Sequence, residues 1–363
     1  MLPDIFEYIK WRGDLSFHSD PPNEIDALVF SGLAYICFGA VFSADLTARM
    51  TLRDAARAVL SMPEALSRSQ IRNDRELLKN ALESRRFGNC ILTHYIDRIV
   101  PEEETQFAAV AFLLDDGSAF LAFRGTDDSL TGWKEDFNMS FLESVPAQRM
   151  AVEYVDLFAR SYVMPLRLAG HSKGGNLAVY AGARVAENIQ SRILRVYNND
   201  GPGFGPHMMT DEGYLRIVPK IRTFVPQSSV IGMLLEHEEP YTVVKSDQVS
   251  LLQHDFYSWR LVANTFTRVE DITADSRFLD MTIKNWIAQM SPQDRNTLVD
   301  ALFGLLESGE VKNAMDIFHP RNIRHYMKAL SENGNMRKLF SDEFRSLVAA
   351  AKKAREQFGI AEK

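Results

Sequence analysis

A serine lies between two glycines in the segment Gly170-His171-Ser172-Lys173-Gly174. An apolar run precedes this segment and an alanine-rich run follows it, which predicts a strand, a sharp turn and a helix. That arrangement is typical of a nucleophile elbow, where side chains at Gly170 and Gly174 would collide with neighbouring backbone. The turn projects the serine hydroxyl near the positive end of the helix. The pattern predicts Ser172 as a nucleophile for acyl transfer, and a plain strand–helix turn is the alternative.

Lys173 follows the serine, and both its backbone and its side chain need an explanation. Its N–H points to where the oxyanion of an acyl-transfer intermediate would form, so Lys173 is a predicted oxyanion donor. Its side chain puts a positive charge at the start of a helix, which is unfavourable by roughly 0.3–1 kcal/mol. We therefore expect a carboxylate partner, and Asp127, Asp128 and Asp136 are the candidates. A solvated lysine is the alternative.

A serine nucleophile needs a general base, which in this order of elements follows the last strand. The histidines that follow the serine are His207, His237, His254, His319 and His325. His254 comes shortly after the predicted strand Tyr241–Val244, so we predict that it is the base. A structural loop histidine is the alternative. His237 lies among three glutamates, a pattern typical of a solvated charged loop.

The acid that would orient the histidine is less clearly marked. The usual position follows the predicted strand Ile221–Val225, but the residues there are Pro226-Gln227-Ser228-Ser229 and include no carboxylate. Asp200 ends the preceding predicted strand and is our choice. Asp247 is the alternative acid, although aspartate often caps turns. A neutral side chain or a backbone carbonyl could also orient His254.

Short apolar runs supply the strands that must position these residues. They lie at Gln106–Leu114, Ala119–Phe123, Val163–Ala169, Arg192–Asn198, Ile221–Val225 and Tyr241–Val244. Asp115-Asp116-Gly117 separates the first two runs, which predicts a hairpin. The alanine-rich segment Asn176–Val185 predicts a helix. Strands that alternate with helices indicate an α/β fold with a mostly parallel central sheet and helices on both faces.

Both ends of the chain predict helices rather than strands. Thr51–Met62 and Glu76–Arg85 are charged on one side and apolar on the other, which is typical of helices packed on a larger body. Ser291-Pro292 is a favourable helix start. We see no clean linker. The sequence therefore predicts an α/β-hydrolase core over residues 91–270, with a mainly helical N-terminal segment (1–90) and a helical C-terminal segment (271–363) packed on it.

Two motifs together resemble a known family. Phe123-Arg124-Gly125-Thr126, with Trp133 and Asp136, resembles the oxyanion loop of class 3 lipases, and the serine segment resembles their nucleophile elbow. The resemblance implies that Thr126 supplies a second oxyanion donor; a cap at the end of a strand is the alternative. The run Gly-His-Ser-Lys-Gly-Gly-Asn-Leu-Ala further resembles a bacterial family of lipase-like α/β-hydrolases, as do Trp11-Arg12-Gly13-Asp14 and Asn23-Glu24-Ile25-Asp26. That family implies the order serine, acid, histidine along the chain, and it implies no substrate.

Composition narrows the class of protein. The chain has 363 residues, of which 46% are hydrophobic and 25% charged, with a formal net charge of -7. The negative charge argues against a nucleic-acid partner. Two cysteines do not form a disulfide scaffold, and no His/Cys cluster has metal-ligand spacing, so we expect no metal and no cofactor. The N-terminus lacks the features of a secretion signal. We expect a cytoplasmic protein, with the uncharged stretch Ala27–Ala44 as a buried element rather than a membrane span.

These patterns converge on one reaction. Ser172 would attack the carbonyl of a small-molecule acyl ester, His254 would move the proton, and Asp200 would orient the imidazole. The N–H of Lys173 and a donor from Thr126 would hold the oxyanion. The alternative is a protein that keeps the fold for binding or scaffolding and has little or no catalytic activity. Acyl chain length, lid position and oligomeric state do not follow from the sequence.

Overall fold

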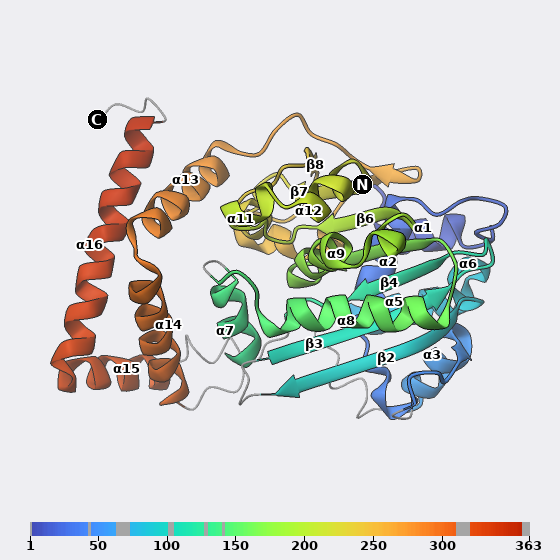
Figure 1. Ribbon diagram of the computed structural model, residues 1–363, viewed down its shortest axis with the longest axis horizontal. Helices are drawn as coiled ribbons and strands as arrows, with labels where there is room; N and C mark the ends of the chain where they lie inside the picture. The colour runs from blue at the N-terminus through green and yellow to red at the C-terminus, as the bar shows by residue number, and fades with distance from the viewer. Residues whose placement is uncertain are drawn as a thin grey trace.

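The computed structural model describes residues 2–42, 45–62, 73–100, 105–126, 130–139, 142–309 and 320–357. Within these residues, eight strands form the central sheet, and their order in the sheet is their order in the chain (Figure 1). The strands are β1 (Met50–Thr51), β2 (Ile91–Val100), β3 (Thr105–Leu113), β4 (Ala119–Phe123), β5 (Leu166–His171), β6 (Ile193–Asn199), β7 (Ile221–Pro226) and β8 (Tyr241–Val244). A separate hairpin joins β9 (Leu261–Val262) to β10 (Thr265–Phe266).

The sheet has an antiparallel part and a parallel part. Strands β1 to β4 pair antiparallel, and the predicted hairpin around Gly117 is confirmed as the connection from β3 to β4. Strands β4 to β8 all run parallel, each joined to the next by a connection that crosses a face of the sheet. The predicted α/β fold is therefore confirmed. Strand β2 was not predicted, because Thr93, His94 and Asp97 interrupt its apolar pattern.

Helices cover both faces of the sheet, and successive side chains along each strand point alternately toward the two faces. Phe120 and Ala122 pack on one face, whereas Ala119, Leu121 and Phe123 pack on the other, as the two-residue period of a strand requires. The first face is covered by α1 (Ile5–Arg12), α2 (Glu24–Leu33), α3 (Leu52–Leu60), α5 (Asp74–Glu83) and α6 (Arg85–Gly88). The second face is covered by α8 (Pro146–Ser161), α9 (Lys173–Arg184) and α12 (Glu212–Ile217), with short helices α10 (Glu187–Gln190) and α11 (Pro206–Met209) nearby.

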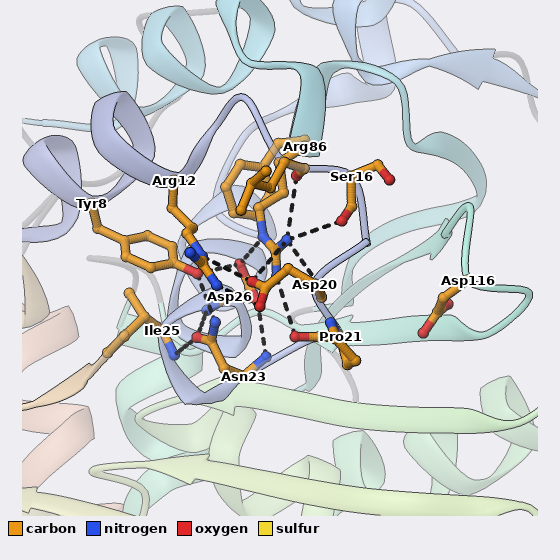
Figure 2. A network of polar contacts seen from close by, with 12 residues as sticks. Tyr8, Arg12, Ser16, Asp20, Pro21, Asn23, Ile25, Asp26, Arg86 and Asp116 are labelled. Carbon is orange, nitrogen blue, oxygen red and sulfur yellow. Dashed lines mark hydrogen bonds and ion pairs between the residues drawn. The ribbon is translucent and has the colours of Figure 1, made fainter. Parts of the chain in front are cut away.

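A buried ion pair holds the N-terminal helices together (Figure 2). Arg86 makes two hydrogen bonds to Asp26, at 2.7 and 2.6 Å, and both side chains are fully buried. Tyr8 donates to the same carboxylate, and the backbone N–H of Asn23 donates to it as well. A buried pair of this kind is stable only when every oxygen is satisfied, as here. The segment Asn23–Asp26 that resembles the lipase-like family thus has a structural use, because it caps α2 and receives Arg86.

Among the described residues, four helices follow the hairpin β9–β10, and they stand beside the sheet (Figure 1). They are α13 (Ala274–Gln289), α14 (Pro292–Glu307), α15 (Pro320–Glu332) and α16 (Gly334–Gln357). Ser291 caps α14 as its side chain accepts a hydrogen bond from the backbone N–H of Asp294, so the predicted helix start is confirmed. Among the described residues no helix is both long and apolar enough to cross a membrane. The described part of the uncharged stretch Ala27–Ala44 begins in the buried helix α2.

Candidate active site

Ser172 occupies a sharp turn between β5 and α9. Its backbone has φ 57° and ψ -135°, a conformation that L-residues rarely adopt and that costs free energy unless the surroundings enforce it. The flanking glycines explain how the turn closes. A Cβ on Gly170 would lie 2.1 Å from the carbonyl of Gly174, and one on Gly174 would lie 2.2 Å from the carbonyl oxygen of Phe123. The strand–turn–helix arrangement predicted around Ser172 is therefore the one that the structure has.

Three of the predicted residues form a continuous chain of hydrogen bonds. The hydroxyl of Ser172 lies 2.9 Å from Nε2 of His254, and Nδ1 of the same imidazole lies 2.7 Å from a carboxylate oxygen of Asp200. The Asp200 side chain is 1% exposed and the His254 side chain 28% exposed. This geometry fits a serine donating to Nε2 and an Nδ1–H donating to the carboxylate, which is the tautomer that proton transfer from serine requires.

Asp200 is held rigidly at the end of β6. Its φ of 56° places it in the left-handed region, and its backbone N–H donates to the carbonyl of Phe224 on β7. The carboxylate oxygen that does not face His254 accepts from the hydroxyl of Ser229 at 2.5 Å and from the N–H of Gly232 at 3.2 Å. Hydrogen bonds of this kind favour the charged carboxylate in a buried site. The loop after β7 therefore supplies donors to the acid rather than the acid itself.

The alternative acid lies elsewhere. Asp247 binds Arg260 at 2.6 Å and is 39% exposed, so its carboxylate is engaged on the surface and not at the imidazole. The interpretation of His237 as a residue of a solvated loop is wrong. Its side chain is 8% exposed, it lies 3.2 Å from Glu239, and its Nε2 donates to the carbonyl of Gly232. Glu239 also accepts from two buried hydroxyls and is itself buried, whereas Glu236 and Glu238 are exposed.

His171, the residue before the serine, positions the backbone of His254. Its Nε2 lies 2.8 Å from the carbonyl oxygen of His254, and its Nδ1 lies 3.0 Å from the hydroxyl of Tyr35. Burial lowers the pKa of His171 well below its usual value, and the nearby His254 lowers it further, so the ring is neutral. A neutral ring has one N–H, which the carbonyl of His254 must accept, and Tyr35 then donates to the other nitrogen. Neither His171 nor Tyr35 was predicted to have a role at the site.

Lys173 extends inward and forms a buried ion pair. Its ammonium lies 3.1 Å from Glu135 and 3.8 Å from Asp136, both on α7 (Leu130–Asn138), and it donates to the carbonyl of Gln106 on β3. The expected carboxylate partner is present in Asp136, whereas Asp127 and Asp128 lie outside the described residues. The closer partner, Glu135, was missed, although it neighbours Asp136 in the sequence. Glu135 also accepts the N–H groups of Ala147 and Gln106.

Thr126 lies at the other end of the same polar cluster. Its hydroxyl donates to Asp136 at 2.5 Å, so the loop after β4 and the residue after the nucleophile share one carboxylate. Gly125 packs directly on the elbow, since a Cβ there would lie 2.7 Å from the carbonyl oxygen of His171 and 3.1 Å from Cβ of Ser172. The two predicted oxyanion donors therefore lie on two neighbouring segments, Thr126 in the loop after β4 and Lys173 at the start of α9, directly after Ser172. Across the described residues, no three His, Cys, Asp or Glu side chains converge as a metal site would require.

Comparison with known families identifies the chain. The model of the Mbeg1-like family matches residues 81–304, which is more than half of the sequence. The chain belongs to the Mbeg1-like family. The matched region contains Ser172, Asp200 and His254, together with the whole of α7. It begins within α5, after Tyr35, and ends within α14, so α1 to α3, α15 and α16 of this Mbeg1-like protein lie outside it, whereas α13 and most of α14 lie inside it.

Solved structures with a similar chain trace include two kinds of lipase. A native Rhizomucor miehei lipase propeptide complex is 12% identical over 66% of this chain and 81% of that chain, with a TM-score of 0.38. M37 lipase is 14% identical over 58% of this chain and 70% of that chain, with a TM-score of 0.37. The curated proteins gave no match to this Mbeg1-like sequence.

The buried pair between Lys173 and Glu135 gives a prediction for this Mbeg1-like protein. We expect Lys173→Met to lower the free energy of unfolding by about 3–5 kcal/mol, because it leaves the Glu135 carboxylate buried without its partner. Turnover should fall more than substrate binding, since misplaced oxyanion donors chiefly weaken transition-state stabilisation. Urea denaturation and steady-state kinetics measure the two effects.

The matched control removes both charges. The double variant Lys173→Met/Glu135→Gln removes both members of the closer pair and leaves only Asp136, the more distant and 35% exposed partner, without the lysine, so it should recover most of the lost stability. A single variant as stable as the unmodified protein would show that the ion pair does not hold the elbow against α7.

Proposed function

We propose that this protein is a serine hydrolase that cleaves carboxylic esters of small molecules through an acyl-enzyme on Ser172. The observation that carries the proposal is the chain of hydrogen bonds from Asp200 through His254 to Ser172, at 2.7 and 2.9 Å. A serine hydroxyl at its free pKa is a weak nucleophile and needs a base at this distance to take its proton. The strained elbow and the family match at the same residues support the same conclusion.

The reaction follows from the positions of these groups. Ser172 Oγ attacks the ester carbonyl carbon while its proton passes to Nε2 of His254. The carbonyl oxygen becomes an oxyanion, which the N–H groups of Lys173 and Thr126 stabilise. His254 then gives the proton to the departing alcohol, and the acyl group remains on the serine. A water molecule, activated by the same imidazole, releases the carboxylic acid and restores Ser172. Asp200 keeps Nδ1 protonated throughout and stabilises the imidazolium that forms.

Activity-based labelling tests this proposal directly. A fluorophosphonate forms a covalent bond only with an activated serine, so the full-length protein should be labelled on the peptide that contains Ser172. Ser172→Ala should abolish the label and leave the fold intact, as measured by circular dichroism. Ser191→Ala is the matched control, because Ser191 is an exposed serine that donates to a neighbouring carbonyl, and it should label normally.

The alternative function is binding or scaffolding without turnover. It would follow if the folded protein resisted the probe and also hydrolysed no ester over a series of acyl chain lengths. Labelling of another serine in Ser172→Ala would instead move the nucleophile and contradict the proposed mechanism. The sequence feature that favoured the alternative, a loop after β7 without a carboxylate, no longer favours it, because that loop donates hydrogen bonds to Asp200.

A further inference from the structure

The C-terminal helices line an apolar cavity to which the proposed reaction assigns no role. Its volume is about 460 Å³, within the range of roughly 300–1,000 Å³ that small-molecule sites occupy. Side chains from α13, α14 and α16 line it, together with one residue of the core. The lining residues include Leu234, Trp286, Leu298, Val299 and Phe344.

Two charged side chains line this cavity, and each has a protein partner. Glu343 accepts a hydrogen bond from Nε1 of Trp286 at 3.2 Å, and one Nη of Arg295 donates to the carbonyl of Ile287, whereas Nε of Arg295 has no hydrogen-bond partner among the described residues. The rest of the lining is aliphatic or aromatic, and Phe344 is 67% exposed at its edge. Such a cavity favours an apolar chain over a sugar, a nucleotide or a charged metabolite, because those ligands need several free polar groups to replace their hydration.

The cavity lies on the side of the molecule where the parallel strands end. In Figure 1 the arrowheads of β2 and β4 point toward α7, α13, α14 and α16, and β5 to β8 run in the same direction as β4. Ser172 and Asp200 follow β5 and β6 directly, so they lie at that edge of the sheet.

Two walls of the cavity are joined to elements of the active site. Leu234 lies two residues after Gly232, whose N–H binds Asp200. Helix α14 packs on α7 through an ion pair of 3.1 Å between Asp300 and Lys134. The residue after Lys134 on α7 is Glu135, the partner of Lys173.

We propose that this cavity holds the acyl chain of the ester substrate, so that the C-terminal helices select long-chain, lipid-like esters. The inference rests on the proposed function of Ser172. Each methylene that leaves water for the cavity improves binding by about four-fold, so such a site selects its ligands by chain length. The substrate class is therefore an amphiphile with a long aliphatic chain on one side of the ester bond.

The first experiment measures binding without catalysis. A dibrominated stearic acid quenches tryptophan fluorescence on contact, and Trp286 lines the cavity. In full-length Ser172→Ala, the acid should quench part of the fluorescence in a saturable manner. In Ser172→Ala/Trp286→Phe that saturable component should disappear. Absence of saturable quenching, or equal quenching in both variants, would overturn the proposal whatever the activity of Ser172.

The second experiment measures selectivity. We expect p-nitrophenyl laurate to have a much higher kcat/KM than p-nitrophenyl acetate. Leu298→Trp fills the cavity and should lower kcat/KM for laurate by about ten-fold or more, equivalent to the loss of two or more buried methylenes, while acetate is unaffected. Leu279→Trp is the matched control, because Leu279 lies on α13, is 37% exposed and does not line the cavity.

The outcomes separate the two proposals. If both esters are hydrolysed and Leu298→Trp behaves like Leu279→Trp, the acyl-chain site is wrong and the serine hydrolase stands. If no ester is hydrolysed and no fluorophosphonate label forms, the proposed function is wrong, and the quenching experiment alone decides whether the cavity binds an aliphatic chain.

Discussion

Replacing His254 with alanine should lower kcat for ester hydrolysis by on the order of 10⁶, the loss that follows removal of the base from a serine hydrolase. The imidazole lies 2.9 Å from the Ser172 hydroxyl, and no other histidine among the described residues is hydrogen-bonded to that hydroxyl. Without it the serine proton has no acceptor in the attack and the leaving alcohol has no donor. Steady-state kinetics with a p-nitrophenyl ester measure the change in kcat, and single-turnover measurements check it.

The matched control is His207→Ala. His207 is exposed, and the hydrogen bond of its imidazole is to the carbonyl of Glu143, away from Ser172, so its loss should not change the kinetics. His237 is not a suitable control, because it donates to the carbonyl of Gly232, and the N–H of Gly232 in turn binds Asp200. Comparable losses in His254→Ala and His207→Ala would reject His254 as the base.

Asp200→Asn should lower kcat by on the order of 10⁴. The asparagine keeps the shape of the side chain, but if it directs its NH₂ toward the imidazole it can only donate to Nδ1. The ring then holds its proton on Nε2 and cannot accept the proton of Ser172. Asp247→Asn is the matched control, because Asp247 binds Arg260 on the surface, and it should leave kcat unchanged.

The control for misfolding is thermal unfolding of both variants. Asp200 also receives hydrogen bonds from Ser229 and Gly232, so Asp200→Asn should unfold at a lower temperature than the unmodified protein while remaining folded at the assay temperature. A variant that is folded and fully active would exclude Asp200 as the group that orients His254. Loss of activity in Asp247→Asn alone would assign that role to Asp247.

The parts of the fold that could be predicted are those in which local pattern and final environment agree. Strand β4 is buried on both faces, so its sequence is apolar throughout and its bounds are those that were predicted. Strand β5 is also buried, but it contains Arg167, and the predicted range Val163–Ala169 starts three residues and ends two residues before the observed Leu166–His171. The need for Gly170 is equally local, because a Cβ there would meet the backbone of Gly174, whereas the need for Gly174 comes from the neighbouring strand β4, through the carbonyl oxygen of Phe123. Strand β2 could not be predicted in this way, since its far half is exposed and carries charged residues.

The polar partners around the nucleophile depend on distant parts of the chain. Tyr35 and His171 are separated by 136 positions, and nothing near either residue signals their contact. Glu135 was passed over because the start of α7 was not predicted, so the side of the helix that carries it could not be known. The prediction for His237 was wrong because three neighbouring glutamates are typical of a surface loop. One of them, Glu239, is buried and accepts hydrogen bonds from hydroxyls on α12 and β7.

The agreement between sheet order and chain order has a consequence for biosynthesis. Each strand from β2 onward pairs with the strand that was translated just before it, so the sheet can grow one strand at a time as the polypeptide leaves the ribosome. Ser172 is completed with β5, but its proton acceptor follows 82 residues later. Translation adds roughly 5–20 residues per second. Ser172 of a nascent chain therefore stays without its base for several seconds. If Ser172 acts as proposed, hydrolysis would begin only when almost the whole α/β core has emerged, so partly translated chains would not attack esters in the cell.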